Sequence, residues 1–232
     1  MRIVLKISGE SLKGENSIDS ANLELVYKEI IDIKKDNELI VVVGGGNFWR
    51  GRNELDIDEA LSDYIGMIGT DMNALAICSY LNQKNIPADC YSAFEIQGII
   101  NEATEDNVLS SLKEGKIVVL GGGLGIPNFS TDMTTVSKAM KYDADMILMA
   151  KNVDGVYDKD PKLGDAKKID RMTHEELLEM SLAQGKDSLL ILDLEALVEL
   201  AKCKIPLYIY NSKSIKTIDE VINGDKGTKI IS

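Results

Sequence analysis

The sequence predicts an α/β fold, a three-layer sandwich in which a mostly parallel central sheet carries helices on both faces. Two observations support this prediction. Short runs of β-branched and aliphatic residues alternate along the chain with longer segments of helical character. The short runs are almost entirely apolar, whereas a strand with one face in water would alternate apolar and polar residues. Strands buried on both faces are typical of a parallel sheet covered by helices.

The predicted elements follow one another in regular order. The apolar runs that predict strands are Arg2–Ser8, Leu39–Val43, Ala88–Tyr91, Lys116–Leu120, Asp145–Ala150 and Pro206–Tyr210. The segments between them that predict helices are about Ala21–Lys35, Ile57–Lys84, Asp106–Glu114, Thr131–Tyr142, Thr173–Met180, Asp187–Lys202 and Ser214–Val221. Ser20 precedes the first helix as a candidate cap, and Thr173 with Glu176 forms a capping box.

The chain contains no Pro/Ser-rich linker, repeat or low-complexity stretch. We therefore expect one domain over residues 1–232. Glycine-rich turns are confined to about the first 130 residues, and a different loop chemistry begins near Lys151. This change predicts two lobes within the domain, approximately residues 1–145 and 146–232.

The composition excludes several classes of function. The chain has 26 Lys and Arg against 38 Asp and Glu, a net charge of −12. Such acidity argues against a nucleic-acid-binding surface and against an anionic membrane surface. No apolar run reaches the roughly 18 residues that a membrane span needs. A local cluster of cations and backbone amides can still bind a phosphorylated small molecule.

The chain begins with a strand-like run at Met1 and shows no signal peptide, so we expect a cytoplasmic protein. Cys78, Cys90 and Cys203 are widely spaced, which predicts reduced thiols. The only histidine, His174, is expected on the surface near the start of a helix. A zinc cluster or a Ser-His-Asp triad would have to be built around this single residue.

The first loop whose residues could bind a ligand is Lys6–Ser11, with the sequence KISGES. Lys6 lies near the end of a predicted strand, and the chain then turns at Ser8 and Gly9. Backbone N–H groups of the turn and the lysine ammonium can therefore face a phosphate. The alternative is a lysine at a strand end whose ammonium simply extends into solvent.

The second loop is Gly44–Gly51, with the sequence GGGNFWRG, directly after the strand Leu39–Val43. Consecutive glycines permit close backbone approach to a ligand. Arg50 can then bind a phosphate with two hydrogen bonds. A flexible turn is the alternative, but a turn alone requires neither three glycines nor the arginine.

The third loop, Gly121–Asp132, also follows a predicted strand and opens a helix. Ser130, Thr131 and Asp132 lie where that helix begins, and the free N–H groups of a helix N-terminus favour a phosphate. Helix capping explains Ser130 or Asp132 but not the glycine-rich segment. The fourth loop, Lys151–Pro161, carries the turn signals Asp-Gly and Asp-Pro, and a plain loop is its alternative.

Each of these loops follows the carboxyl end of a predicted strand, so we expect them to converge on one edge of the sheet. Together they offer more anion-binding capacity than one phosphate needs. Two phosphorylated substrates that meet head-on would use it, which predicts a kinase. The sequence lacks the GxxxxGK[ST] motif of P-loop enzymes, a dinucleotide-binding GxGxxG with its acidic partner, and the GxSxG of hydrolases.

These motifs, in this order, resemble the amino-acid kinase family, and nearly the whole chain resembles its bacterial uridylate kinases. The resemblance is carried by KISGES, GGGNFWRG, the segment Asp63–Met67 (DYIGM), the segment Met72–Ala76 (MNALA), NFSTD at 128–132 and VDGVYDKDP at 153–161. It implies phosphoryl transfer from ATP to UMP, with Mg²⁺ carried by ATP and no metal site of the protein's own. It also implies a homohexamer, an acceptor-side lobe at about 1–145 and a nucleotide-side lobe at about 146–232.

The resemblance implies a role for each matching residue. The catalytic residues would be Lys6, which bridges the transferred group, and Asp132, which orients that lysine. The residues that would bind the acceptor are Gly45, Gly46, Arg50, Asp63, Gly125 and Thr131. Those that would bind ATP are Lys6, Ser8, Gly9, Lys151, Asp154, Tyr157 and Asp160.

Several positions depart from the family pattern. Leu124 and Ile126 replace a threonine and an asparagine, Asn128 replaces an aromatic residue, and Asp71 replaces a valine. These changes leave open a related kinase with another acceptor, in which apolar side chains lie beside the acceptor base. A nucleotide-binding storage or regulatory protein without turnover is a further alternative, against which the retained Lys6 and Asp132 argue.

Overall fold

The computed structural model describes residues 1–35, 37–50, 57–162, 164–184 and 191–232. The strands of this part are β1 (Arg2–Ile7), β2 (Glu38–Val43), β3 (Ala88–Ser92), β4 (Asn101–Glu102), β5 (Ile117–Leu120), β6 (Met146–Ala150), β7 (Val156–Tyr157), β8 (Lys168–Ile169), β9 (Arg171–Thr173), β10 (Leu207–Tyr210) and β11 (Thr228–Ile231). Its helices are η1 (Gly9–Leu12), α1 (Ser20–Lys34), α2 (Glu59–Gln83), α3 (Glu105–Lys113), α4 (Thr131–Lys141), α5 (His174–Gln184), α6 (Leu194–Cys203), η2 (Ser212–Ser214) and α7 (Asp219–Ile222).

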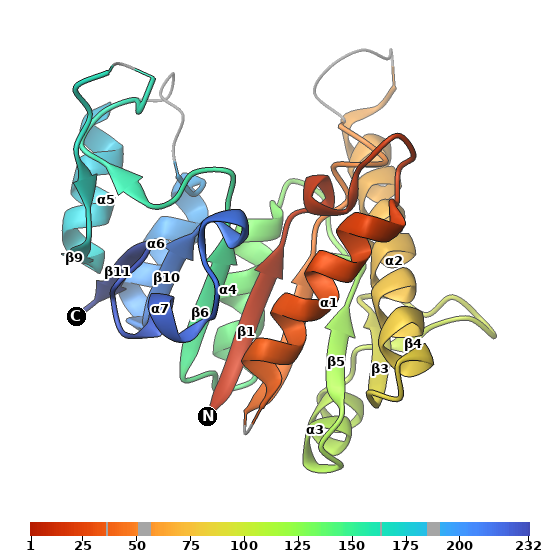
Figure 1. The fold of residues 1–232 in the computed structure, drawn as a ribbon. Coiled ribbons are helices and arrows are strands. Elements are labelled where there is room, and N and C mark those ends of the chain that lie inside the picture. The colour runs from red at the N-terminus through yellow and green to blue at the C-terminus, as the bar shows by residue number, and fades with distance from the viewer. Residues whose placement is uncertain (36, 51–56, 163, 185–190) are drawn as a thin grey trace.

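A nine-stranded sheet runs through the molecule in the order β4-β3-β5-β2-β1-β6-β10-β11-β9 (Figure 1). Every described pairing in this sheet is parallel except that of β10 with β11. The strands β7 and β8 form a separate antiparallel pair. The predicted α/β fold with a mostly parallel sheet is thus confirmed.

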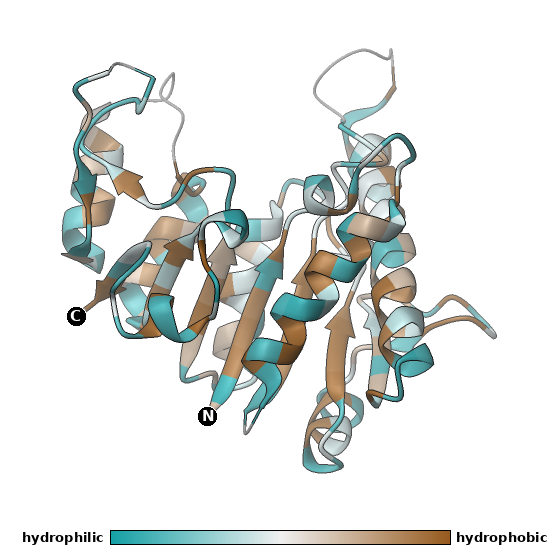
Figure 2. Cartoon of the chain, in the orientation of Figure 1, coloured by the Kyte–Doolittle hydropathy of each residue, from teal (hydrophilic) through white to brown (hydrophobic). Residues whose placement is uncertain are grey.

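Two hydrophobic cores lie on the two faces of the sheet. Residues that alternate along β1 show this division, because Ile3 and Leu5 belong to one core and Val4 belongs to the other. Helices α1, α2 and α7 cover the first core, and α3, α4, α5 and α6 cover the second (Figure 1). Hydrophobic residues fill the strands, while hydrophilic residues dominate the outward surfaces of the helices (Figure 2). Burial on both faces explains why the strand segments lack polar alternation.

Two helix predictions were wrong in their extent. The helix expected over Asp187–Lys202 begins at Leu194, because Asp193 accepts a hydrogen bond from the backbone N–H of Ala196 and caps it; residues 187–190 lie outside the described part. The helix expected over Ser214–Val221 is instead the end of the short helix η2, an irregular connection over residues 215–218 and the single turn α7. The N-terminal cap of α1 is Asp19 rather than Ser20.

Other local predictions have mixed outcomes. The capping box at Thr173 and Glu176 is confirmed, since each side chain accepts a hydrogen bond from the backbone N–H of the other. His174 does begin a helix, but its side chain is buried and not on the surface. Its Nε2 lies 2.9 Å from the carbonyl oxygen of Ile205 and donates to it. This hydrogen bond holds the imidazole ring in the interior.

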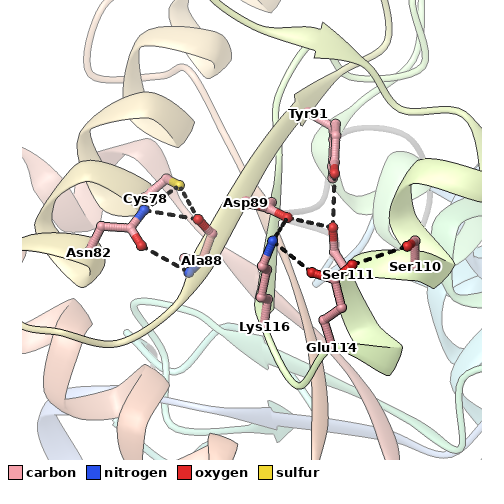
Figure 3. A network of polar contacts seen from close by, with 9 residues as sticks. All are labelled: Cys78, Asn82, Ala88, Asp89, Tyr91, Ser110, Ser111, Glu114 and Lys116. Carbon is pink, nitrogen blue, oxygen red and sulfur yellow. Dashed lines mark hydrogen bonds and ion pairs between the residues drawn. The ribbon is translucent and has the colours of Figure 1, made fainter.

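A polar network holds the β3 edge of the sheet together (Figure 3). The Asp89 carboxylate of β3 accepts from the Ser111 hydroxyl at 2.6 Å and pairs with the Lys116 ammonium at 3.0 Å. The Tyr91 hydroxyl lies 2.8 Å from the same Ser111 oxygen. This network joins α3 to β3 and to the start of β5, so β3, the neighbour of the edge strand β4, is fixed by side chains as well as by its ladder.

The division of the single domain into two lobes stays a prediction. In the described part of the chain, no helix is both long enough and apolar enough to cross a membrane.

Candidate active site

The four loops singled out in the sequence gather at one edge of the sheet. Strands β5, β2, β1 and β6 are adjacent and parallel, and each is followed by one of these loops. Figure 1 shows their carboxyl ends together at the upper edge of the sheet. The parallel order of the strands therefore explains why residues far apart in the sequence meet here.

Two lysines flank one carboxylate at the centre of this edge. Lys6, near the end of β1, places its ammonium 3.2 Å from Oδ1 of Asp132, the second residue of α4. Lys151, just after β6, donates a hydrogen bond of 2.6 Å to Oδ2 of the same carboxylate. The Lys6 side chain is almost fully buried. The cluster therefore carries a net positive charge in a site that is largely screened from water.

Electrostatics fix the protonation of this cluster. Burial alone would raise the pKa of the Asp132 carboxyl, but the charges of Lys6 and Lys151 outweigh burial and hold this pKa below its ordinary value. Burial lowers the pKa of Lys151, and nearby Lys6 adds to that effect while Asp132 opposes it. Asp132 is therefore an anion throughout the neutral range, and it keeps two ammonium groups at fixed positions.

The glycines after β1 and β2 are required by the packing of the protein itself. A Cβ atom at Gly45 would lie 2.5 Å from the carbonyl oxygen of Gly66 on α2. A Cβ atom at Gly9 would lie 2.5 Å from Oδ1 of Asn47 and 2.7 Å from the carbonyl oxygen of Gly44. Such distances are shorter than any van der Waals contact allows, so the two loops can approach each other only without side chains.

A buried pair of amides anchors the second loop to α2, and the sequence analysis did not single it out. Asn47 donates to the side-chain oxygen of Asn73 at 2.9 Å, and Asn73 donates back at 2.7 Å. The second N–H of Asn73 reaches the carbonyl oxygen of Gly44 at 2.7 Å. Both asparagines lie inside the motifs that carry the family resemblance, but their pairing across the fold has no local sequence signal.

Arg50 stands at the rim of the site. Its guanidinium donates to Oε1 of Glu10, from Nη2 at 2.9 Å and from Nε at 3.2 Å. The Arg50 side chain is exposed, and the loop that follows it lies outside the described residues. Glu10 comes from the loop after β1, so this ion pair joins the first and second loops.

Two adjoining cavities open beside these loops. The larger has a volume of about 810 Å³ and the smaller about 210 Å³, and both are lined by Ser62, Asp63, Phe129 and Ser130. Arg50 lines the larger cavity, and the lining of the smaller one includes Gly45, Gly46 and Thr131. The predicted acceptor residues other than Gly125 therefore border one continuous space.

Further contacts shape this space. Oδ2 of Asp63 accepts a hydrogen bond of 2.6 Å from the backbone N–H of Asn128. The Ser130 hydroxyl, which caps α4, donates to the carboxylate of Asp193, which caps α6. The sequence analysis did not assign a role to Phe129, Ser130 or Asp193, although Ser130 was recognised as a helix-start residue. Their place in the cavity wall depends on how α4 and α6 pack together.

The remaining predicted residues lie apart from this space. The Tyr157 hydroxyl donates to Oδ1 of Asp154 at 2.7 Å, and Oδ1 of Asp160 accepts from the backbone N–H of Lys162. Among the described residues, none of these side chains contacts the lysine cluster by a hydrogen bond or ion pair. The hydroxyl of Ser8 caps η1, next to Gly9.

Only part of the third loop lines the two cavities. Gly125 has φ of +77°, which is unfavourable for residues with a side chain, so its presence is explained by the backbone turn. Leu124 and Ile126 line neither of the two cavities. The cavities thus give no support to these side chains as contacts of an acceptor base.

The chain was compared with known proteins. The model of the amino acid kinase family matches residues 1–211. A uridylate kinase of Onion yellows phytoplasma is 37% identical over 100% of this chain and 97% of its own length. One from Rubrobacter xylanophilus is 35% identical over 97% of this chain and 89% of its own length.

Solved structures agree with the sequence matches. The crystal structure of UMP kinase from Ureaplasma parvum superimposes with a TM-score of 0.90 at 31% identity, covering 100% of this chain and 98% of the other. The UMP kinase of Bacillus anthracis gives a TM-score of 0.91 at 29% identity over 99% and 95% of the two chains. The similarity thus extends over both halves of the fold.

Proposed function

Because the chain belongs to the amino-acid kinase family, we propose that it is a uridylate kinase, which transfers the terminal phosphoryl group of ATP to UMP and yields ADP and UDP. Full-length similarity to proteins of that name supports this function. The observation that carries it within the chain is the buried cluster of Lys6, Asp132 and Lys151 beside a cavity that can hold a small phosphorylated acceptor.

In our proposal, Lys6 and Lys151 neutralise the charge that spreads over the transferred phosphoryl oxygens in the transition state. Asp132 does not react; it orients the two ammonium groups and prevents them from repelling each other. The loop Ser8–Gly9 offers backbone N–H groups to the phosphates of ATP, and Asp154, Tyr157 and Asp160 line the nucleotide side. Positioning and electrostatic stabilisation suffice for this reaction, so no covalent enzyme intermediate is required.

The acceptor would occupy the two adjoining cavities. Gly45, Gly46, Arg50 and Thr131 would bind its phosphate, and Asp63 would accept hydrogen bonds from its ribose hydroxyls. Gly125 would contribute by fixing the turn of the third loop. In this proposal the acceptor phosphate would lie at the side of the sheet edge where Thr131 and Asp132 are neighbours on α4, close to the donor phosphate.

Magnesium would enter with ATP. The described residues include no group of three or more His, Cys, Asp or Glu side chains that could hold a metal ion. Oδ1 of Asp132 meets no hydrogen-bond criterion, but it lies 3.2 Å from the Lys6 ammonium, so this carboxylate is already paired with a cation. Mg²⁺ is usually held by substrate phosphates and waters with only one or two carboxylates, so the residues fit an ion that the nucleotide carries on its phosphates. Such an ion would add positive charge at the phosphates.

One assay tests this function and its alternatives. ATP, Mg²⁺ and a panel of nucleoside monophosphates and small acids are mixed with the protein, and ADP release is measured. Selective turnover of UMP supports the proposal. Turnover of a different acceptor would indicate a related kinase, and nucleotide binding without any turnover would indicate a storage or regulatory protein.

We expect Arg50→Ala to raise the KM for UMP by about 10- to 100-fold while kcat changes little, because a charge-assisted contact to phosphate contributes roughly 1.5–3 kcal/mol to binding. Steady-state kinetics with UMP as the varied substrate measures both constants. Glu10→Gln is the matched variant, since it removes the carboxylate that competes for the same guanidinium, and it should lower the KM. A loss confined to kcat in Arg50→Ala would contradict this assignment.

We further propose that the protein is a homo-oligomer, a hexamer by its resemblance to the bacterial enzymes. Helix α2 supports this proposal, because four large apolar side chains three or four residues apart lie exposed along it. They are Leu61 at 55%, Tyr64 at 39%, Ile68 at 47% and Met72 at 42% of full exposure. A contiguous apolar stripe of this kind is unusual on a monomer and common at subunit interfaces.

Light scattering on a size-exclusion column tests the assembly. The native chain, of 25.5 kDa, should elute as a multiple of that mass, and Ile68→Asp should shift it to a smaller species. Leu25→Asp, a change of another exposed leucine outside this stripe, is the control and should leave the mass unchanged. A native monomer at micromolar concentration would refute the proposal.

A further inference from the structure

The carboxyl of Asp71 is buried without a charged partner among the described residues, and the nearby Ser92 hydroxyl compensates for this burial only weakly. It lies on α2, and only 1% of the residue is exposed. Neither of its oxygens has a hydrogen-bond partner, and no described lysine or arginine forms an ion pair with it. A buried carboxylate in this state is strongly disfavoured relative to its protonated form. Such a group requires an explanation that packing alone does not give.

The backbone of the third loop lies directly against this carboxyl. A Cβ atom at Gly121, the first residue after β5, would lie 2.3 Å from Oδ1 of Asp71 and 2.9 Å from its Cα. The glycine therefore touches the carboxyl with no side chain between them. A water molecule or a cation can reach Oδ1 from this side only if the loop moves away.

The next residues of the loop are held on both sides. The backbone N–H of Gly122 donates to Oγ1 of Thr70 on α2 at 2.7 Å. On the opposite side, a Cβ atom at Gly122 would lie 2.3 Å from Oγ of Ser92 at the end of β3. Gly122 has φ of +69°, so this turn depends on glycine. The start of the loop is thus clamped between α2 and β3, with Asp71 inside the clamp.

This clamp forms part of the wall of the smaller cavity. Thr70 and Gly123 line that cavity together with Gly45 and Thr131. A displacement of Gly121 and Gly122 away from α2 would break the hydrogen bond to Thr70 and move Gly123. A change at the Asp71 carboxyl that displaced this loop would therefore alter the space that we assign to the acceptor.

We propose that Asp71 is a proton-dependent positioning residue, whose neutral form holds the Gly121–Gly125 loop against α2 and whose charged form loosens that loop and weakens binding of the nucleoside monophosphate acceptor. The acceptor part of this proposal rests on the proposed function. The loop part does not, because it concerns only contacts within the chain.

None of the described titratable side chains around Asp71 is expected to change its charge between pH 5.5 and 7.5. Cys90 on β3 faces it, and burial followed by the charges of Cys78, Asp71 and Asp89 raises the pKa of this thiol far above neutrality. Burial raises the pKa of Cys78 to about 11. The Asp89 carboxylate is engaged by Lys116 and Ser111 (Figure 3). No described cation stabilises the charged form of Asp71.

Burial raises the pKa of Asp71 to about 6, and Ser92 beside it limits the rise. The folded chain binds this proton more tightly than the unfolded chain, in which the carboxyl has a pKa near 4. The stability that the neutral carboxyl contributes is therefore fully present below pH 4 and is lost as the pH rises through about 6. The clamp is therefore expected to be tightest in mildly acidic solution and looser above neutrality.

Hydrogen–deuterium exchange at residues 121–125 tests the loop part. The native chain is compared with Asp71→Asn, which keeps the shape of the side chain but cannot ionise, at pH 5.5 and at pH 7.5. We expect similar exchange at the lower pH and at least about threefold faster exchange in the native chain at the higher pH. Asp71→Val is a second variant in case the asparagine does not fold, and Asp106→Asn, an exposed acid on α3, is the control.

Kinetics tests the acceptor part. The ratio of the KM for UMP in the native chain to that in Asp71→Asn should rise about threefold or more from pH 5.5 to 7.5. Ionisation of the UMP phosphate affects both proteins equally and cancels in this ratio. The proposal is overturned if the ratio of the native to the Asp71→Asn exchange rate is the same at both pH values. It is also overturned if that ratio changes with pH while the ratio of the two KM values does not. If no variant phosphorylates UMP, the proposed function fails, while the exchange data still decide whether Asp71 positions the loop.

Discussion

Replacing Lys6 with alanine is expected to lower kcat for UMP phosphorylation by about 10²-fold or more, with a much smaller change in the KM for UMP. The Lys6 ammonium is buried and lies 3.2 Å from Asp132, in a position to stabilise charge that develops only as the phosphoryl group moves. An interaction of this kind acts on the transition state and not on substrate binding, so its loss appears in kcat. Initial rates over a range of UMP concentrations at saturating ATP and Mg²⁺ measure the effect.

Two further variants give this experiment its controls. Lys6→Arg keeps the charge but changes its geometry, so it should recover part of the lost rate. Lys13→Ala removes an exposed lysine from the loop that follows η1 and should leave kcat close to the native value. A thermal melt of each variant checks that the fold is intact. If Lys6→Ala raises the KM and spares kcat, the lysine binds substrate and does not act in the chemical step.

Replacing Gly45 with alanine is expected to destabilise the fold by about 2–3 kcal/mol, because the added methyl group must overlap backbone atoms. The new Cβ would lie 2.5 Å from the carbonyl oxygen of Gly66 and 3.1 Å from the backbone nitrogen of Thr70. Neither atom can move without shifting α2. For a chain of this size the loss corresponds to a decrease in Tm of roughly 5–10 °C, which differential scanning calorimetry measures.

Gly46 offers a matched comparison for this effect. A Cβ atom there would approach nothing closer than Oε1 of Glu10 at 3.5 Å, an ordinary contact with a flexible side chain. Gly46→Ala should therefore change Tm by only a small fraction of the Gly45→Ala effect. Similar decreases in Tm for both variants would show that the glycines are needed for the backbone conformation of the loop instead of for close packing.

The central part of the fold could be predicted because its signals are local. An apolar run such as that of β2 identifies a strand buried on both faces, whatever its neighbours are. The strands β4, β7, β8, β9 and β11 were missed because they have only two to four residues each, and their conformation depends on pairing with other segments. The helix expected from Asp187 failed for a related reason, since the capping contact of Asp193 decides its start.

The candidate site shows the same distinction. Convergence of the four loops followed from one rule about the carboxyl ends of parallel strands, and the Lys6–Asp132 contact agrees with it. The amide pair of Asn47 and Asn73 and the buried carboxyl of Asp71 could not be predicted in the same way. Their environments are created by contacts between segments that only the folded chain brings together.

If Arg50 binds the acceptor phosphate as we propose, its ion pair with Glu10 makes acceptor binding an exchange of one anion for another. The guanidinium is already committed to a carboxylate, so an arriving phosphate replaces one anion by another, and the number of ion pairs made by Arg50 stays the same. Added salt then screens the starting and final states alike, which makes this step less sensitive to ionic strength than the capture of a free cation. Because Glu10 is tethered beside Arg50, it also acts as an internal competitor at high effective concentration. After phosphoryl transfer, the same carboxylate can reclaim the arginine and help the product to leave.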